Sequence, residues 1–221
     1  MTQTKELTLC AGDLYFTADT AGEGPLVVCL HGFPDHRRTW RHQISALAGA
    51  GFRVVAPSIR GYEPSSQPRD GQYRVAALAQ DVVGWINDLG EHHAHLIGHD
   101  WGSVVASAAA NFAPNRFLSL TTLAVPPLHR IRAMVSHRPF SLRRLWYMAF
   151  FQTRALPERL LRSPDGRLIR RLWADWSPDW SCPEEEMQAV IEGFCRPGVA
   201  KGALSYYRQL PDNFTALGRR S

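Results

Sequence analysis

The segment Gly98-His99-Asp100-Trp101-Gly102 places a carboxylate where a side chain can do chemistry. An apolar run leads into it and a small-residue helical pattern follows, which is the form of a nucleophile elbow. A carboxylate at the apex is ionised near neutral pH, and the start of a helix favours an anion. We therefore interpret Asp100 as a nucleophile that attacks an electrophilic carbon and forms an ester. The alternative is an aspartate that only caps the helix.

A second segment, His31-Gly32-Phe33-Pro34, follows another apolar run and has the pattern of a tight turn. Such a turn could aim the Phe33 N–H at the elbow. With the N–H of Trp101, it would form an oxyanion hole that stabilises negative charge on an oxygen. The tetrapeptide alone is an ordinary turn, and it gains meaning only beside the elbow.

The surrounding elements must bring these segments together. Four short apolar runs are typical of strands buried on both faces of a parallel sheet: 26–30, 53–57, 95–98 and 117–125. Alternating residues in the first twenty positions predict a leading antiparallel pair. Helical patterns fill 73–90 and 102–114. This alternation predicts an open α/β sheet with mostly parallel strands.

The pattern changes after Pro126-Pro127, and no strand-like run appears before about Leu210. Prolines and acidic residues recur at helix-start positions there, which predicts four or five helices forming a second lobe. The predicted organisation is a core over 1–125, a helical cap over 126–211 and the start of a return to the core over 212–221.

Composition indicates an ordinary globular chain, with 45% hydrophobic and 20% charged residues among 221. No apolar run approaches the roughly 18 residues of a membrane span, and the N-terminus lacks a leader pattern. We therefore expect a cytoplasmic chain with no membrane partner. Four widely spaced cysteines predict neither a disulfide framework nor a zinc site.

A basic run and a histidine-rich segment could suggest a nucleic-acid partner and a metal site, but their patterns favour neither. The basic run 129–144 alternates with apolar residues, as on a solvated amphipathic helix, so no nucleic-acid partner is expected. The histidine-rich segment 91–95 is interpreted as the surface approach to a strand rather than as a metal site.

Three motifs together resemble the α/β-hydrolase fold, in its epoxide hydrolase and haloalkane dehalogenase branch: HGFPD (31–35), RGYEPSS (60–66) and GHDWGS (98–103). The resemblance implies a helical cap inserted after the sixth strand, where this chain changes character. It implies a small apolar epoxide or a related small molecule as substrate, and no cofactor.

Within the cap, LWYMAFFQ (145–152) and ALSYYRQL (203–210) resemble the segments that hold the two epoxide-protonating tyrosines of this family. These tyrosines fall on Tyr147 and Tyr207, and a phenol is a sensible general acid for an opening epoxide. The alternative is two aromatic residues that pack cap helices. Trp101 matches a halide-binding donor of haloalkane dehalogenases. It is also common in epoxide hydrolases, so a dehalogenase-like activity stays open.

The family releases its ester with a histidine-activated water and an acid, both placed after the cap. Here no strand-like run follows the cap pattern, and no histidine lies beyond His137. We therefore expect at most one alkylation without turnover. The chain is interpreted as truncated or as a fragment. The alternatives are a complementing polypeptide or homo-oligomer, and a relative that only binds ligands.

Overall fold

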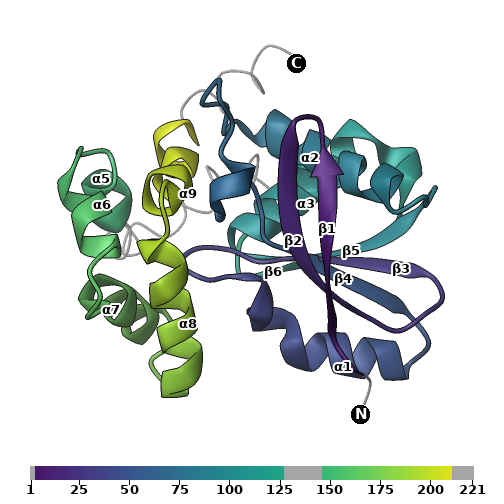
Figure 1. The fold of residues 1–221 in the computed structure, drawn as a ribbon, viewed down its shortest axis with the longest axis horizontal. Coiled ribbons are helices and arrows are strands. Elements are labelled where there is room, and N and C mark those ends of the chain that lie inside the picture. Colours follow the sequence, from purple (N-terminus) through teal and green to yellow (C-terminus); the bar gives the residue numbers. More distant parts are fainter. Residues whose placement is uncertain (1–2, 127–145, 211–221) are drawn as a thin grey trace.

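The computed structural model describes residues 3–126 and 146–210, and its centre is a six-stranded sheet (Figure 1). The strand order is β1-β2-β4-β3-β5-β6. β1 and β2 form an antiparallel pair, β2 lies antiparallel to β4, and β4, β3, β5 and β6 run parallel. The strands span Lys5–Ala11, Leu14–Ala21, Leu26–Leu30, Arg53–Pro57, Ala94–His99 and Phe117–Leu123 for β1 to β6.

Helices cover both faces of this sheet, with α1 on one face and α2 and α3 on the other (Figure 1). Because successive strand residues point to opposite faces, Val27 of β3 packs with Ile44 of α1, whereas Val28 packs in the cluster that holds α2 and α3. The core helices are α1 (Arg41–Gly49), α2 (Val75–Asp88) and α3 (Trp101–Phe112), with 3-10 turns η1 (Arg37–Trp40), η2 (Pro64–Ser66) and η3 (Pro114–Arg116).

Residues 146–210 contain five helices and no strand, and they lie together at one side of the sheet (Figure 1). Four of them bury apolar residues against their neighbours; α7, for example, buries Leu168, Ile169 and Leu172. The helices are α5 (Trp146–Phe150), α6 (Leu156–Leu161), α7 (Arg167–Trp176), α8 (Glu184–Cys195) and α9 (Val199–Arg208). In the described part of the chain, none of the helices is long and apolar enough to cross a membrane.

The strand predictions agree with the structure to within two residues at each end, and the helical patterns correspond to α2 and α3. Helix α1 was missed, because it buries only Ile44 and so has no apolar periodicity to detect. The basic run 129–144 and the predicted return over 212–221 lie outside the described residues.

Strand β6 differs from the other parallel strands in its exposure. Leu118, Leu120 and Leu123 are 59%, 41% and 44% exposed. Within the described residues β6 pairs only with β5, so it forms an edge of the sheet with apolar side chains open to solvent.

Candidate active site

Asp100 occupies the sharp turn between β5 and α3, as the glycine pattern predicted. Its φ of 53° and ψ of −119° lie in a region that residues with side chains rarely adopt. The turn is held on both sides: the Asp100 N–H donates to the Leu123 carbonyl at 3.1 Å, and its carbonyl accepts from the Ser103 N–H at 2.9 Å. The carboxylate is thus projected from a fixed backbone.

The glycines of this turn permit a close approach of helix to strand. A Cβ on Gly102 would overlap the carbonyl groups of Leu30 and His31, and one on Gly98 would overlap the Gly102 carbonyl. Ser103 adds a tie that sequence reasoning missed, because its hydroxyl donates to the Gly98 carbonyl at 2.6 Å and accepts from the Leu123 N–H at 3.0 Å. Strands β5 and β6 and helix α3 are therefore joined beneath Asp100.

The turn after β3 meets this carboxylate directly. The Phe33 N–H donates to Asp100 Oδ1 at 2.9 Å. Gly32 allows the contact, since a Cβ there would overlap the Cβ and Oδ1 atoms of Asp100. The Trp101 N–H lies near enough to the Asp100 carboxylate to lower its pKa. The two backbone donors that the sequence pairs with Asp100 are thus gathered on that side chain.

His31 supports the turn rather than facing the carboxylate. It is fully buried; its Nδ1 donates to the Gly32 carbonyl at 3.0 Å, and its Nε2 accepts from the Ile59 N–H at 3.1 Å. Burial lowers the pKa of His31 to about 3, so the ring is neutral at ordinary pH. Pro34 follows through a cis Phe33–Pro34 peptide bond.

Burial raises the pKa of Asp100, and three neighbours oppose that rise: the N–H groups of Phe33 and Trp101 and the charge of His99. A second carboxylate, Asp35, was missed although it ends the HGFPD motif. Burial raises its pKa to about 7, the His36 N–H at 2.8 Å and the Thr39 hydroxyl lower it, and the Asp100 charge raises it further. Two acids in mutual repulsion therefore share this side of the site.

The helices of residues 146–210, which we call the cap helices, bring both predicted tyrosines to the same place. The rings of Tyr147 on α5 and Tyr207 on α9 are 5.8 Å apart, and that of Tyr207 lies 5.2 Å from each of Phe33 and Trp101. Burial raises the pKa of both phenols, and so does the charge on Asp100. Both hydroxyls therefore stay protonated and can donate hydrogen bonds.

Further aromatic rings enclose the site, and most meet edge to face. Phe151, Trp176 and Phe194 lie around the Phe33 ring, and the first two also contact Tyr147. Tyr62 is a third nearby phenol that sequence reasoning missed. It is 5% exposed, its hydroxyl has no hydrogen-bond partner among the described residues, and burial and then the Asp100 charge raise its pKa.

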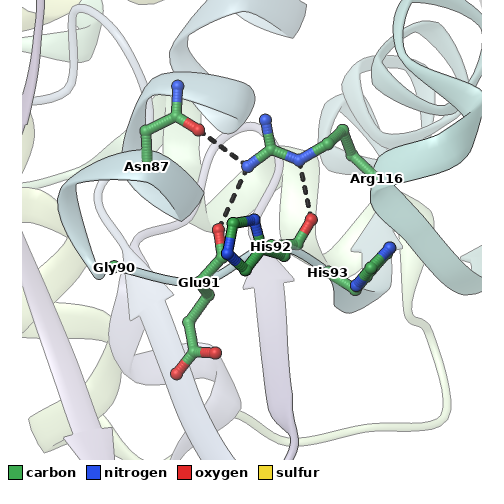
Figure 2. A pocket seen from close by; sticks show the side chains of 6 residues that line it. All are labelled: Asn87, Gly90, Glu91, His92, His93 and Arg116. Carbon is green, nitrogen blue, oxygen red and sulfur yellow. Dashed lines mark hydrogen bonds between the residues drawn. The ribbon is translucent and has the colours of Figure 1, made fainter.

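A hollow of about 420 Å³ on the surface lies elsewhere, around the segment after α2 (Figure 2). Its centre is Arg116, which donates to Asn87 Oδ1 and to the carbonyls of Glu91 and His92 at 2.7, 3.1 and 2.7 Å. These bonds hold the loop, and no residue of the Asp100 site lines the hollow. Within 3–126 and 146–210, no cluster of three or more His, Cys, Asp or Glu is arranged to hold a metal ion.

Comparison with known proteins places this site in context. Residues 25–184 match a family model described as alpha/beta hydrolase fold. Epoxide hydrolase A of Mycobacterium tuberculosis is 37% identical, with 88% of this chain and 70% of the relative covered. Epoxide hydrolase B of the same species is 39% identical over 168 residues, which are 68% of this chain and 47% of the relative. The chain thus spans about half the length of the latter.

Solved structures agree with the sequence comparison. The crystal structure of epoxide hydrolase A from Mycobacterium thermoresistibile superposes with a TM-score of 0.80 at 30% sequence identity. The match covers 98% of this chain and 78% of that chain. Both the sheet and the helices of residues 146–210 therefore have counterparts in that structure.

Proposed function

Because the chain belongs to the α/β hydrolase fold family, among its epoxide hydrolase-like members, we propose that it opens epoxides through an ester at Asp100. In this reaction the carboxylate attacks a carbon of the three-membered ring, and the bond between that carbon and the epoxide oxygen breaks. The oxygen leaves as an alkoxide and takes a proton from Tyr147 or Tyr207. The product is a hydroxyalkyl ester of Asp100.

One observation carries the proposal: Asp100 lies between backbone donors from the core and two phenols from the cap. Oδ1 is held by the Phe33 N–H, so Oδ2 is the oxygen that attacks. The two phenols lie near enough to Asp100 for its charge to raise their pKa, and burial raises the pKa of each as well, so both remain protonated. A correctly placed general acid contributes about 10²–10⁴-fold to the rate.

The aromatic enclosure supports a small apolar epoxide as substrate, since rings such as Phe151 and Trp176 offer apolar contacts and exclude water. A haloalkane dehalogenase-like reaction is the second candidate, and it needs the Trp101 indole N–H for the halide. Here the Trp101 ring packs edge to face on Tyr207 at 5.2 Å, and its side chain lowers the pKa of this tyrosine against the effect of burial. That engagement favours the epoxide.

The test is intact-mass spectrometry of the chain after incubation with styrene oxide. We expect a mass increase of one epoxide, mapped by peptide fragmentation to Asp100, and none at that position in Asp100→Asn. Asparagine is a suitable control because it tolerates a positive φ and keeps the shape of the side chain. Adducts on Cys10, Cys182 and Cys195 are common to both proteins and act as internal references.

Two results would overturn the proposal. The first is an unmodified Asp100 in wild-type protein under conditions that alkylate the cysteines. The second is halide release from a haloalkane with no adduct from any epoxide. Saturable binding of styrene oxide that is equal in wild type and Asp100→Asn, without an adduct, would indicate a binding protein instead.

A further inference from the structure

Helix α7 contacts the core turn through the Trp176 ring, which lies against Phe33, and through a hydrogen bond from Trp173. The Trp173 indole Nε1–H donates to the Pro34 carbonyl at 2.8 Å. Pro34 follows Phe33, whose N–H holds Asp100 Oδ1 at 2.9 Å. A cap side chain therefore binds the core turn at Pro34, the residue after the Phe33 donor that holds the Asp100 carboxylate.

The Phe33 ring is packed among cap aromatics, but the backbone of this turn has few hydrogen-bonding groups that fix its orientation. Pro34 has no N–H of its own to donate, so its carbonyl is the only backbone group it offers for a hydrogen bond. On the core side, His31 secures the Gly32 carbonyl at 3.0 Å. On the cap side, Trp173 secures the Pro34 carbonyl. Phe33 lies between these two anchors, and its N–H is oriented by both.

Helix α8 holds the continuation of the same segment. Glu186 pairs with Arg41 at 2.9 Å and with Arg38 at 3.9 Å. Glu186 is largely buried, so this pair is less screened than an ordinary surface ion pair. The neighbouring Glu184 pairs instead with Arg170 inside the cap. Two cap helices thus converge on the segment that carries the Asp100 donor.

We propose that Trp173 is a positioning residue for ester formation, which keeps the Phe33 N–H aimed at Asp100 Oδ1. The inference rests on the proposed function, since it assigns to Trp173 a role in the same reaction. Trp173 acts on Asp100 through its hydrogen bond to the Pro34 carbonyl. Loss of its indole N–H lets the turn move, weakens the bond to Oδ1 and leaves the carboxylate less well stabilised.

This role has an electrostatic signature. Burial raises the pKa of Asp100, and the Phe33 N–H is among the groups that oppose the rise. A weaker Phe33 bond therefore raises that pKa further, and the ionised nucleophile forms only at higher pH. The other titratable groups that interact electrostatically with Asp100 are unchanged by the variant: His99, Asp35, Tyr62, Tyr147 and Tyr207.

The experiment compares Trp173→Phe with Trp180→Phe. These two rings stack on each other with centroids 5.3 Å apart, so each variant disturbs the stack, but only the first removes the bond to Pro34. The rate of Asp100 adduct formation with styrene oxide is followed from about pH 5 to about pH 9. We expect Trp173→Phe to slow the reaction about 3- to 10-fold below its midpoint and to shift the midpoint upward. Trp180→Phe changes neither.

Amide hydrogen exchange at Phe33 gives a readout that needs no reaction. Exchange at this N–H should be faster in Trp173→Phe and unchanged in Trp180→Phe. Unchanged Phe33 exchange, or equal effects in both tryptophan variants, overturns the positioning role. Absence of any wild-type adduct overturns the proposed function instead, while the exchange result still decides whether Trp173 holds the turn.

A second pair of variants covers the case in which Trp173→Phe fails to fold. Glu186→Gln loosens the same segment from helix α8, and Glu184→Gln removes an ion pair internal to the cap. Only the first should speed Phe33 exchange and raise the midpoint. Equal behaviour of the two glutamate variants contradicts the proposal.

Discussion

The two sides of the Asp100 site differ in the groups they offer: backbone N–H groups on one side and side-chain hydroxyls on the other. The core wall, which we define as Gly32, Phe33, Asp100 and Trp101, offers backbone N–H groups and a side chain on a strained backbone. The cap wall, defined as Tyr147 and Tyr207 with the rings around them, offers the tips of side chains. The core wall is fixed by close backbone approach, whereas the cap wall is fixed by aromatic edges.

This difference separates what each wall can tolerate. A backbone N–H remains in place after most substitutions of its own side chain. It is displaced when a neighbouring glycine is replaced, because the new Cβ pushes the two backbone segments apart. A phenol is lost by a single substitution that leaves the fold in place. Variants of the cap wall should therefore change reactivity at constant stability, and variants of the core wall should change stability itself.

The largest effect is expected from removing both cap hydroxyls in Tyr147→Phe, Tyr207→Phe. Adduct formation with styrene oxide should fall about 10²–10⁴-fold, because the departing alkoxide loses its proton donors. The rings remain, so the melting temperature should stay close to that of the wild type. Initial adduct rates from intact-mass spectra and thermal melts measure both quantities. A double variant that reacts at the wild-type rate would remove the cap wall from the chemistry.

Gly102→Ala attacks the core wall through the backbone. The new Cβ meets the carbonyl groups of Leu30 and His31, so we expect the free energy of unfolding to drop by about 2–4 kcal/mol. Gly193→Ala in α8 is the matched control, since nothing lies near its Cβ and alanine favours a helix by about 0.5–1 kcal/mol. Urea denaturation of both variants tests the pair. Similar losses in the two would contradict the contrast between the walls.

His31, which supports the core wall, should contribute to the pH dependence of stability with a sign opposite to that of Asp35, whose pKa burial raises to about 7. The folded-state pKa of His31 is lowered to about 3, so its contribution is present above pH 6.5 and is lost as pH falls toward 3. For this group alone, the free energy of unfolding should fall by about 2 kcal/mol between about pH 7 and about pH 5. His31→Gln should lose this dependence and retain that of His36, whose pKa is lowered to about 4 by burial.

Urea denaturation at the two pH values measures this difference. An identical pH dependence in wild type and His31→Gln would show that the ring takes up no proton on unfolding in this range. The described cap, residues 146–210, contains no histidine, so its share of the dependence should be small.

The smallest expected effect distinguishes two adjacent tyrosines of α9. The Tyr206 hydroxyl donates to the Arg60 carbonyl at 2.6 Å, so it connects cap to core. Tyr206→Phe should cost about 0.5–1.5 kcal/mol of stability and leave the adduct rate unchanged. Tyr207→Phe should slow adduct formation and leave the free energy of unfolding nearly unchanged. If Tyr206→Phe slows the reaction as much as Tyr207→Phe, the assignment of roles within α9 is wrong.

The approach of the two turns that form the core wall can be predicted from the sequence because its determinants are local. Gly98 and Gly102 flank Asp100 within five residues, and short apolar runs mark the strands on either side. The turn at His31 follows such a run, and the two turns meet because parallel strands end at the same edge of the sheet. β3 and β5 are neighbours, with Leu30 opposite Gly98.

The remaining features depend on approaches between distant segments. Asp35 is an ordinary turn acid until burial raises its pKa to about 7, and Trp173 is one of seven tryptophans until α7 docks on Pro34. Tyr147 and Tyr207 could be named only by resemblance, because no spacing rule links α5 to α9. Helix α1 was missed since a single buried residue, Ile44, leaves no periodic signal.

The contact between Gly32 and Asp100 also has a genetic consequence. Any side chain at position 32 would occupy the space of the Asp100 Cβ and Oδ1 atoms. The two positions are therefore not free to vary independently, although they lie on different turns. In a library that randomises both, we expect partial epistasis: alanine at 32 should be tolerated better beside glycine at 100 than beside aspartate, although its Cβ would still meet the His99 carbonyl at 2.8 Å. The absence of a Cβ at position 32 thus couples the substitutions that two positions far apart in the sequence can tolerate.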